Sequence, residues 1–594
     1  MSLSNSGNSI KISGIAADAK FQDTLAKLRE KLNAQKQTKI SNPHPAPISQ
    51  ETAEENSGDN SSQSIVGEVS QSVSEVSSGL DKFGNEITYN ARQTEFIKVA
   101  SQGEHCILIG AAGTGKTTSQ RGAILNMIQN GLLPVMSGHD HKYLPSNVPG
   151  IVICAFTRRA TNNIRRNLPL ELQSNCITIH KLLEYEPVYF ETINEETGDT
   201  KNTMRFEATR NRMHPIPESV KCIVIEESSM VSVELYRQIE EAAPHCPQII
   251  LLGDIQQLPP VFGSAILGYK MLEWKTVELT EVYRQALDSP IISLAHRILS
   301  GRPIKSPELK SLNVPSKLTL HPWIKPISAE SATLTLAKFF IAALEKNKYD
   351  PETDAILIPF NKSCGTIELN NHIANTLAQK SGRPVYEIIH GWKRSYYSIG
   401  DKCLYDKEDC VIVDIYRNPE YSGVEPREES IYMDYWGNKR NDPDSKSSNG
   451  PESGDDVDLL LQNVAAGNID SDTEERVRAA SHTIVLRMLD SEIERKVKAT
   501  GEINNLDLGY AITVHKSQGS EFDKVFLCLH KSHATMMQRE LLYTAVTRAK
   551  RELYVICESD SFEKGIMNQR IKGNTLAEKA EYFKGKLENG ELQS

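Results

Sequence analysis

The sequence predicts an α/β protein built from two parallel-sheet lobes, with a β-hairpin inserted in the first lobe and a small β-barrel in the second. Apolar runs typical of buried strands alternate with helical segments, a pattern that favours parallel sheets covered by helices. A phosphate-binding pattern, G-x-x-x-x-G-K-[ST], spans Gly110–Thr117 between one such run and a helical segment. Polar residues directly follow several apolar runs, at the strand ends where such sheets bind ligands.

The length and composition indicate several domains. The chain has 594 residues, and a single core rarely exceeds roughly 250–300 residues. The net charge of −10 provides no global positive field, so binding to nucleic acid must depend on local basic surface. The ten cysteines form no Cys-x-x-Cys pair, which is typical of reduced thiols inside cells. Neither a signal peptide nor a membrane-spanning run is apparent, so we expect an intracellular protein with no membrane partner, cytoplasmic if bacterial or phage-encoded and nuclear if eukaryotic.

The chain divides into segments of different character. We expect an N-terminal tail at 1–82, a first lobe at 83–290 with its hairpin at about 185–215, a second lobe at 291–395 and 506–560, an insert at 396–505 with a disordered acidic loop at about 438–472, and a polar C-terminal tail at 561–594.

The N-terminal tail contains one helical pattern. Apolar residues recur at helical spacing within Lys20–Lys36, and the following segment, Gln35–Gly79, is too polar to order itself. The pattern fits a marginal helix on a tether equally well as a helix that docks on a partner, such as a single-strand-binding or replication protein.

The phosphate-binding pattern has a physical basis. Its glycines let backbone N–H groups turn inward around phosphate oxygens, and the N-terminus of the next helix, which we expect to run to Asn130, adds partial positive charge. Lys116 then reaches the β- and γ-phosphates, and the Thr117 hydroxyl ligates Mg²⁺. The alternative is a glycine-rich turn that binds nothing. The candidate nucleotide ligands here are Gly110, Ala111, Ala112, Gly113, Thr114, Gly115, Lys116, Thr117 and Thr118.

Two predicted strands that follow this loop end in polar or basic residues. Ile151–Phe156 is expected to be a strand, and four arginines follow it within nine residues: Arg158, Arg159, Arg165 and Arg166. They suit a phosphate backbone, although a solvated helix face is an equal alternative for the last two. Ile177–Leu182 is expected to be another strand.

The first lobe also contains a predicted hairpin and an acidic pair. Val188–Ile193 and Thr203–Glu207 are expected to be its strands. Further on, the apolar run Cys222–Ile225 leads into Glu226 and Glu227. Paired carboxylates after a buried strand can hold Mg²⁺ and orient an attacking water.

The second half repeats the strand and helix alternation and is interrupted by an insert. The expected strands are Ala355–Asn361, Tyr397–Leu404, Val411–Ile415, Ser481–Leu489, Leu508–Val514 and Glu552–Cys557, and the expected helices are Cys364–Gln379 and Glu540–Arg551.

Six segments in order resemble the motifs of superfamily 1 helicases, in the RecD-like branch that includes the phage Dda helicase. They are Gly110–Thr117, Ile225–Met230, Gly253–Pro260, Tyr283–Gln285, Val514–Glu521 and Tyr543–Lys550. The resemblance covers roughly residues 85–560. It implies two RecA-like lobes, an SH3-like barrel insert, ATP and Mg²⁺ as cofactors, and single-stranded and forked DNA as partners.

The resemblance also implies roles for individual residues. Gln93 reads adenine, although with Asn90 it also forms a capping-box pattern. Glu226 holds Mg²⁺ where the family usually has aspartate, and Glu227 is the catalytic acid. Gln257 is the γ-phosphate sensor that links hydrolysis to DNA, and Arg284 and Arg548 stabilise charge on the transferring phosphoryl group. Gln518 and Glu521 lie in the motif that touches both the nucleotide and the DNA strand. The expected strand contacts are Phe156, Thr157, Arg158, Thr178, His180, Asn361 and His515, of which Phe156 either stacks on a base or belongs to the core.

The implied activity is 5′ to 3′ movement on single-stranded DNA, with ATP hydrolysis driving duplex unwinding and the hairpin as the wedge. The alternatives are an RNA helicase, a translocase that displaces proteins without unwinding, and a recruitment module whose ATPase is weakened by Glu226.

Overall fold

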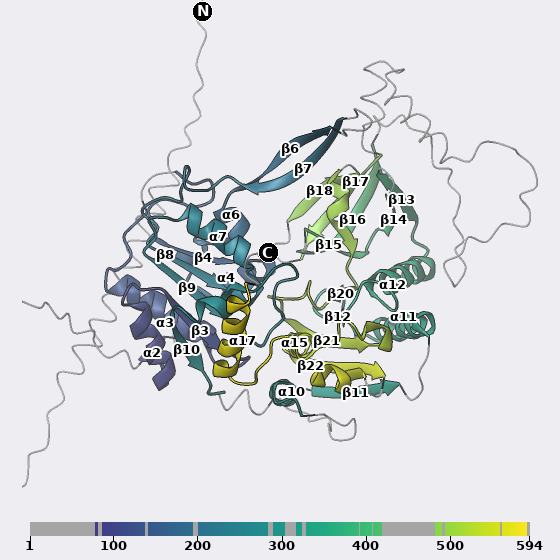
Figure 1. Cartoon of the computed structure of the whole chain (residues 1–594). Coiled ribbons are helices and arrows are strands. Elements are labelled where there is room, and N and C mark those ends of the chain that lie inside the picture. Colours follow the sequence, from purple (N-terminus) through teal and green to yellow (C-terminus); the bar gives the residue numbers. More distant parts are fainter. Residues whose placement is uncertain are drawn as a thin grey trace, which may run out of the picture.

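The computed structural model places two lobes side by side, each built on a β-sheet (Figure 1). It describes residues 78–80, 86–136, 140–193, 200–282, 289–302, 317–323, 328–390, 393–406, 408–418, 481–489, 493–499, 501–558 and 561–590. The N-terminal helix, nearly all of the segment after it, the acidic loop at 438–472 and Arg284 lie outside these residues. None of the described helices has the length and apolar character needed to cross a membrane.

The first lobe contains a six-stranded parallel sheet in the order β10-β3-β9-β8-β4-β5. Its strands are β3 (Cys106–Gly110), β4 (Ile151–Ala155), β5 (Cys176–Thr178), β8 (Cys222–Glu226), β9 (Gln248–Gly253) and β10 (Lys275–Leu279). Its helices include α2 (Ala91–Ala100), α3 (Lys116–Gln129), α4 (Arg158–Asn167), α5 (Leu170–Gln173), α6 (Ile179–Leu182), α7 (Val233–Ala242) and α8 (Ile266–Lys270). Helices cover both faces of the sheet, so neighbouring residues of β3 are buried in separate hydrophobic cores on its two faces. Ile107 belongs to one core and Leu108 to the other.

The second lobe contains a five-stranded parallel sheet in the order β11-β22-β21-β12-β20. Its strands are β11 (Lys317–Trp323), β12 (Ala355–Ile358), β20 (Ala511–Thr513), β21 (Phe522–Leu529) and β22 (Ala549–Glu558). Helices α10 (Pro290–Leu299), α11 (Ala329–Glu345), α12 (Thr366–Ser381) and α15 (Arg539–Val546) accompany it. The prediction of an α/β protein with parallel sheets is confirmed.

Antiparallel elements project from both lobes. In the first, β6 (Tyr185–Ile193) pairs with β7 (Thr200–Ala208) as a long hairpin that reaches toward the insert of the second lobe (Figure 1). The insert contains β13 (Val385–His390), β14 (Lys393–Ser398), β15 (Lys402–Tyr405), β16 (Glu408–Arg417), β17 (His482–Met488), β18 (Glu494–Lys498) and β19 (Leu506–Leu508). The last five form one sheet in the order β18-β17-β16-β15-β19, and its closure into an SH3-like barrel stays a prediction. A short pair, β1 (Ser78–Leu80) and β2 (Glu86–Thr88), precedes α2.

Four predicted elements are wrong in their extent. The strand expected over Leu508–Val514 is two strands of different sheets, because β19 ends at Leu508 in the insert and β20 begins at Ala511 in the second lobe. The strand expected over Ile177–Leu182 ends at Thr178, whose side chain accepts a hydrogen bond from the Lys181 N–H and caps α6. The strand expected over Tyr397–Leu404 is broken at Gly400, which has a φ of 89°. Helix α15 ends at Val546, so the last residues of the helix expected to reach Arg551 belong to β22.

The last described segment crosses from the second lobe to the first. Helix α16 (Ser561–Met567) packs on α15, whereas α17 (Leu576–Glu588) packs on α8. Figure 1 shows α17 beside the first lobe. Phe583 of α17 is buried in the core of the first lobe. A Cβ atom added at Gly268 of α8 would lie 2.2 Å from the ring of Phe583, so the close approach requires glycine. The polar sequence of this segment gave no sign of the packing.

Candidate phosphate-binding site between the two lobes

The loop between β3 and α3 has the shape of a phosphate cradle. Gly113 and Gly115 have φ angles of 80° and 84°, in the left-handed region that favours glycine. The Thr114 hydroxyl donates a hydrogen bond of 2.9 Å to the carbonyl of Ala111, which closes the turn. A Cβ atom at Gly110 would lie 2.5 Å from the Thr114 hydroxyl oxygen. The loop therefore depends on its glycines, and its residues fit a bound phosphate group.

Lys116 begins α3 and folds back over the loop. Its ammonium group donates hydrogen bonds to the carbonyls of Gly110, at 2.6 Å, and Ala111, at 3.2 Å. Thr117 and Thr118 follow in the first turn of the helix, with Thr117 exposed. Lys116 is the only charged residue of this loop and lies at the N-terminus of α3. Its positive charge and the helix N-terminus both favour an anion there.

The acidic pair lies at the end of β8. Glu226 is the last residue of the strand and is buried, and burial raises the pKa of its carboxyl to about 8, with Glu227 adding to the rise and Lys116 opposing it. Glu227 has a φ of 50°, a conformation that costs energy in a residue with a side chain. A divalent cation beside Glu226 would favour its charged form, and Thr117 and Glu226 stay the predicted Mg²⁺ ligands.

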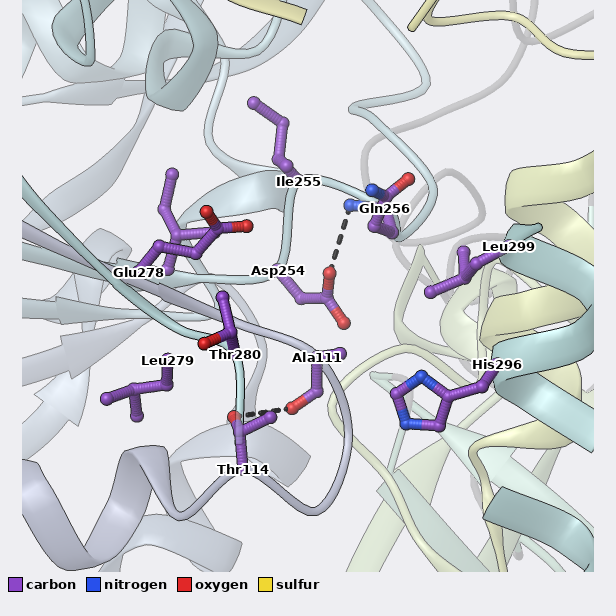
Figure 2. Close-up of a pocket in the computed structure, with 12 residues that line it drawn as sticks. Ala111, Thr114, Asp254, Ile255, Gln256, Glu278, Leu279, Thr280, His296 and Leu299 are labelled. Atoms are coloured by element: carbon purple, nitrogen blue, oxygen red, sulfur yellow. Dashed lines mark hydrogen bonds between the residues drawn. The ribbon is translucent and has the colours of Figure 1, made fainter. Parts of the chain in front are cut away.

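A small cavity of about 200 Å³ opens beside the phosphate loop. Figure 2 shows Asp254 of the first lobe pointing into it and His296 of α10 facing Asp254 from the second lobe. Burial lowers the pKa of His296, with Asp254 opposing this, and burial raises the pKa of Glu278. The cavity is lined by Ile109, Gly110, Ala111, Thr114, Asp254, Ile255, Gln256, Glu278, Leu279, Thr280, His296 and Leu299.

The turn after β9 is held from both lobes. The Asp254 carboxylate accepts a hydrogen bond of 3.0 Å from the Gln256 N–H. The Leu258 N–H donates to the hydroxyl of Thr544 at 2.9 Å, and the Gln518 side chain donates to the Leu258 carbonyl at 2.9 Å. Between these anchors lies Gln257, whose buried Oε1 has no hydrogen-bond partner among the described residues. The second lobe therefore contacts the turn that contains the predicted γ-phosphate sensor.

The predicted arginine of the second lobe is buried between α15 and β22. The Arg548 guanidinium donates to the carbonyls of Thr544, at 3.0 Å, and Ser520, at 3.1 Å. Glu521, directly before β21, forms an ion pair of 3.6 Å with Lys550. The structure thus places Arg548 on the second lobe, held by that lobe's own carbonyls.

Gln93 has a visible structural role. It is fully buried, its Oε1 accepts a hydrogen bond of 3.1 Å from the Asn90 N–H, and the Asn90 side chain accepts one of 2.8 Å from the Gln93 N–H. The two residues form a capping box at the start of α2. The contact of Gln93 with adenine stays a prediction.

Three aromatic rings gather where β4 and β5 end. The centroids of Phe156 and His180 are 5.5 Å apart, and those of His180 and Tyr185 are 4.9 Å apart. Phe156 is half-buried and packs against the first-lobe core. Thr157 and Thr178 cap α4 and α6 with their hydroxyls. Tyr185 was not among the predicted DNA contacts, because it is the first residue of the hairpin strand β6 and belongs to no sequence motif.

The basic helix α4 faces the insert of the second lobe. Arg158 lies 3.4 Å from Glu408 and 4.0 Å from Asp406. Arg159 is buried and forms an ion pair with Asp409, which also pairs with Lys402 at 3.3 Å.

Arg165 serves the fold, since it donates to the Cys176 carbonyl at 2.9 Å, whereas Arg166 is exposed. Of the remaining predicted strand contacts, Asn361 is exposed and accepts a hydrogen bond of 2.9 Å from Thr366. His515 is half-buried, and burial lowers its pKa, as does Arg570. The strand contacts of these residues stay predictions.

Comparisons with known proteins agree with this architecture. Residues 93–263 match the AAA domain family, and residues 508–556 match the UvrD-like helicase C-terminal domain. The ATP-dependent RecD2 DNA helicase of Deinococcus radiodurans is 25% identical over 471 residues, which cover 79% of this chain and 49% of that protein. The RecBCD enzyme subunit RecD of Mycobacterium tuberculosis is 22% identical over 509 residues, covering 79% of this chain and 69% of the subunit.

This chain therefore spans about half the length of the RecD2 helicase. A solved structure of two coordinating Pif1 helicases at forked double-stranded DNA aligns over 85% of this chain and 98% of that one, with a TM-score of 0.42 and 16% identity. The two domain matches and the RecD relatives, together with the ordered motifs, support the resemblance of this chain to the RecD-like superfamily 1 helicases.

Proposed function

We propose that the protein is an ATP-dependent DNA helicase that moves 5′ to 3′ on single-stranded DNA and unwinds duplex at forks. The observation that carries this proposal is the direct link between the phosphate loop, the turn after β9 and the second lobe, made by Gln518, Tyr543 and Thr544. A change at the nucleotide site therefore acts on the position of the second lobe. Such coupling is what a motor needs in order to convert hydrolysis into movement.

The residues of the site divide the work of hydrolysis. The phosphate loop and Lys116 bind the phosphates, while Thr117 and Glu226 hold Mg²⁺. Bound Mg-ATP supplies the phosphoryl group whose transfer to water releases free energy. Glu227 orients the water, and Gln257 responds to the γ-phosphate. Arg548 and Arg284 stabilise negative charge as it develops, which requires Arg548 to exchange its carbonyl partners when the lobes move.

The single-stranded DNA crosses the carboxyl ends of the β-strands in the two parallel sheets. The aromatic rings of Phe156, His180 and Tyr185 offer stacking surfaces for bases, and each stacked base contributes about 1–3 kcal/mol. Thr157, Thr178, Arg158, Asn361 and His515 contact the backbone as the lobes move. The β6–β7 hairpin stands beside this path as the wedge that separates the duplex.

The test combines phosphate release with strand separation. We expect the rate of ATP hydrolysis with single-stranded DNA to be at least 10-fold higher than the rate with RNA of the same sequence. We also expect the protein to unwind a fork with a 5′ tail and not a fork with a 3′ tail. Stimulation by RNA alone would identify an RNA helicase. DNA-stimulated hydrolysis that displaces a bound protein without separating strands would identify a translocase. Basal hydrolysis that no strand stimulates would reject the motor and favour a recruitment module.

A further inference from the structure

Tyr543 of α15 joins the second lobe to the phosphate loop of the first. Its hydroxyl accepts a hydrogen bond of 3.0 Å from the backbone N–H of Ala112 and donates one of 2.6 Å to the carboxylate of Asp254. The side chain is fully buried and is among the largest fully buried side chains of the described residues. Both partners lie far away in the sequence, at 431 and 289 positions of separation.

The Ala112 N–H belongs to the loop that a phosphate group would occupy. Phosphate loops bind through backbone N–H groups that point at the phosphate oxygens. The Tyr543 hydroxyl oxygen, which is neutral, accepts the hydrogen bond from an N–H group that is suited to bind an anionic phosphate oxygen. Charge-assisted hydrogen bonds are roughly twice as strong as neutral ones, so a phosphate oxygen would win the competition for this N–H.

The same hydroxyl is linked to the groups that respond to the nucleotide. Asp254 holds the turn that contains Gln257, through the hydrogen bond from the Gln256 N–H. Thr544, the residue after Tyr543, accepts from the Leu258 N–H, and its carbonyl accepts from the guanidinium of Arg548. A shift of Tyr543 therefore moves α15 at the point where it contacts both the turn after β9 and the arginine.

We propose that Tyr543 is a positioning residue whose hydroxyl competes with nucleotide phosphate for the Ala112 N–H, so that filling the phosphate loop removes one contact of α15 with the first lobe and lets the second lobe shift. This inference rests on the proposed function, because it assigns the contact that carries nucleotide occupancy to the strand-binding surface. Without phosphate the hydroxyl has two partners, Ala112 and Asp254. With phosphate it keeps Asp254 alone.

The test uses the full chain with Tyr543→Phe, which removes the hydroxyl and retains the ring. The control is Tyr269→Phe. Tyr269 is a buried tyrosine of the first lobe, and its hydroxyl has no hydrogen-bond partner in the part of the chain that the structure describes. The measured quantity is the affinity for a fluorescent ADP analogue, with and without single-stranded DNA. Thermal unfolding of both variants serves as the check on folding.

We expect Tyr543→Phe to bind the nucleotide about 3–10-fold more tightly than the parent protein without DNA, because one competing hydrogen bond is gone. We also expect DNA to change that affinity less than 2-fold in the variant and by a larger factor in the parent and in Tyr269→Phe. A purely structural role would lower the melting temperature and would not tighten binding. Unchanged or weaker binding, or unchanged coupling to DNA, would overturn the inference.

Two further measurements separate the possible failures. If the parent and Lys116→Ala bind the nucleotide equally poorly, the proposed function fails; if only Lys116→Ala loses binding while Tyr543→Phe behaves as the parent, this inference alone fails. If Tyr543→Phe does not fold, amide hydrogen exchange in the parent decides. The Ala112 amide should be protected without nucleotide, and exchange as fast as that of Gly113 would contradict the contact.

Discussion

The ammonium group of Lys116 lies 2.6 Å from the carbonyl oxygen of Gly110, so the lysine is held by the loop that it serves. We expect Lys116→Ala to lower DNA-stimulated hydrolysis at least 100-fold, because it removes the positive charge that faces the transferred phosphoryl group. Phosphate release with and without single-stranded DNA measures this. Lys98→Ala, in the last turn of α2, is the control and should stay within 2-fold. Turnover retained by Lys116→Ala would disprove the site assignment.

The ion pair between Arg159 and Asp409 joins the first lobe to the insert of the second. We expect Arg159→Ala to loosen this junction, because removing one partner of a largely buried pair typically costs about 3–5 kcal/mol. Limited proteolysis and the melting temperature report the loss, and DNA-stimulated hydrolysis should fall at least 5-fold. The exposed Arg166→Ala is the matched control for stability. Equal behaviour of the two variants would show that the pair does not hold the lobes.

The β6–β7 hairpin can be shortened without changing its register. Replacing Thr192–Lys201 by Asn-Gly leaves Glu191 opposite Asn202, next to a two-residue turn that suits a hairpin. We expect hydrolysis stimulated by single-stranded DNA to remain within 2-fold and unwinding of a 5′-tailed fork to fall at least 10-fold. Loss of both activities to the same degree would count against the wedge.

Glu226 makes stability depend on pH. Its pKa is raised from 4.5 to about 8 by burial, so the folded protein binds a proton that the unfolded chain has released between these values, and its contribution to stability declines as the pH rises through this window. Glu226→Gln removes this dependence. Without nucleotide or Mg²⁺, we expect the variant to melt roughly 2–5 °C above the parent at pH 8.5 and close to it at pH 5. A parallel pH dependence of the two melting temperatures would contradict burial of the carboxyl as the cause of its raised pKa.

Addition of Mg²⁺ with ADP should raise the melting temperature of the parent and have a smaller effect on Glu226→Gln, because the amide is a weaker ligand for a hard cation. Thermal unfolding of both proteins, with ADP alone and with ADP and Mg²⁺, measures the difference. An equal rise in both proteins would argue that Glu226 is not a metal ligand.

Gly268 permits the packing of α17 on the first lobe. We expect Gly268→Ala to displace Phe583, because the added Cβ would lie 2.2 Å from its ring, and to lower the melting temperature as much as Phe583→Ala does. Gly585→Ala is the matched control. A Cβ there meets nothing within 4 Å, and alanine in a helix is favoured by about 0.5–1 kcal/mol. A neutral Gly268→Ala would show that α17 is not held by this contact.

Continuous apolar runs made the central strands predictable. Cys106–Ile109 and Cys222–Ile225 are fully buried strands in the structure, as a sheet covered on both faces requires. The loop between strand and helix followed from its glycine spacing, and the acidic pair from its place at a strand end. These features are local, so the sequence contains them directly.

Contacts across long separations could not be predicted in this way. Nothing near Tyr543 indicates that its hydroxyl meets Asp254, and nothing in the polar α17 indicates that Phe583 fills the core of the first lobe. The carboxylates of Glu408 and Asp406 lie beside Arg158, and no pattern around Arg158 reveals this; its contact with DNA stays a prediction.

The strand order of the second sheet determines when that sheet can form during synthesis of the chain. All strands of the first sheet lie between residues 106 and 279, so that sheet can form while the ribosome is still translating the rest, and Phe583 of α17 joins its core last. In the second sheet β22 lies between β11 and β21, and β21 between β22 and β12, so β11 and β12 wait for neighbours synthesised far later. A nascent chain stalled before residue 511 lacks both neighbours of β12, so the apolar residues Ile356, Leu357 and Ile358 have no strand to pair with and are open to aggregation.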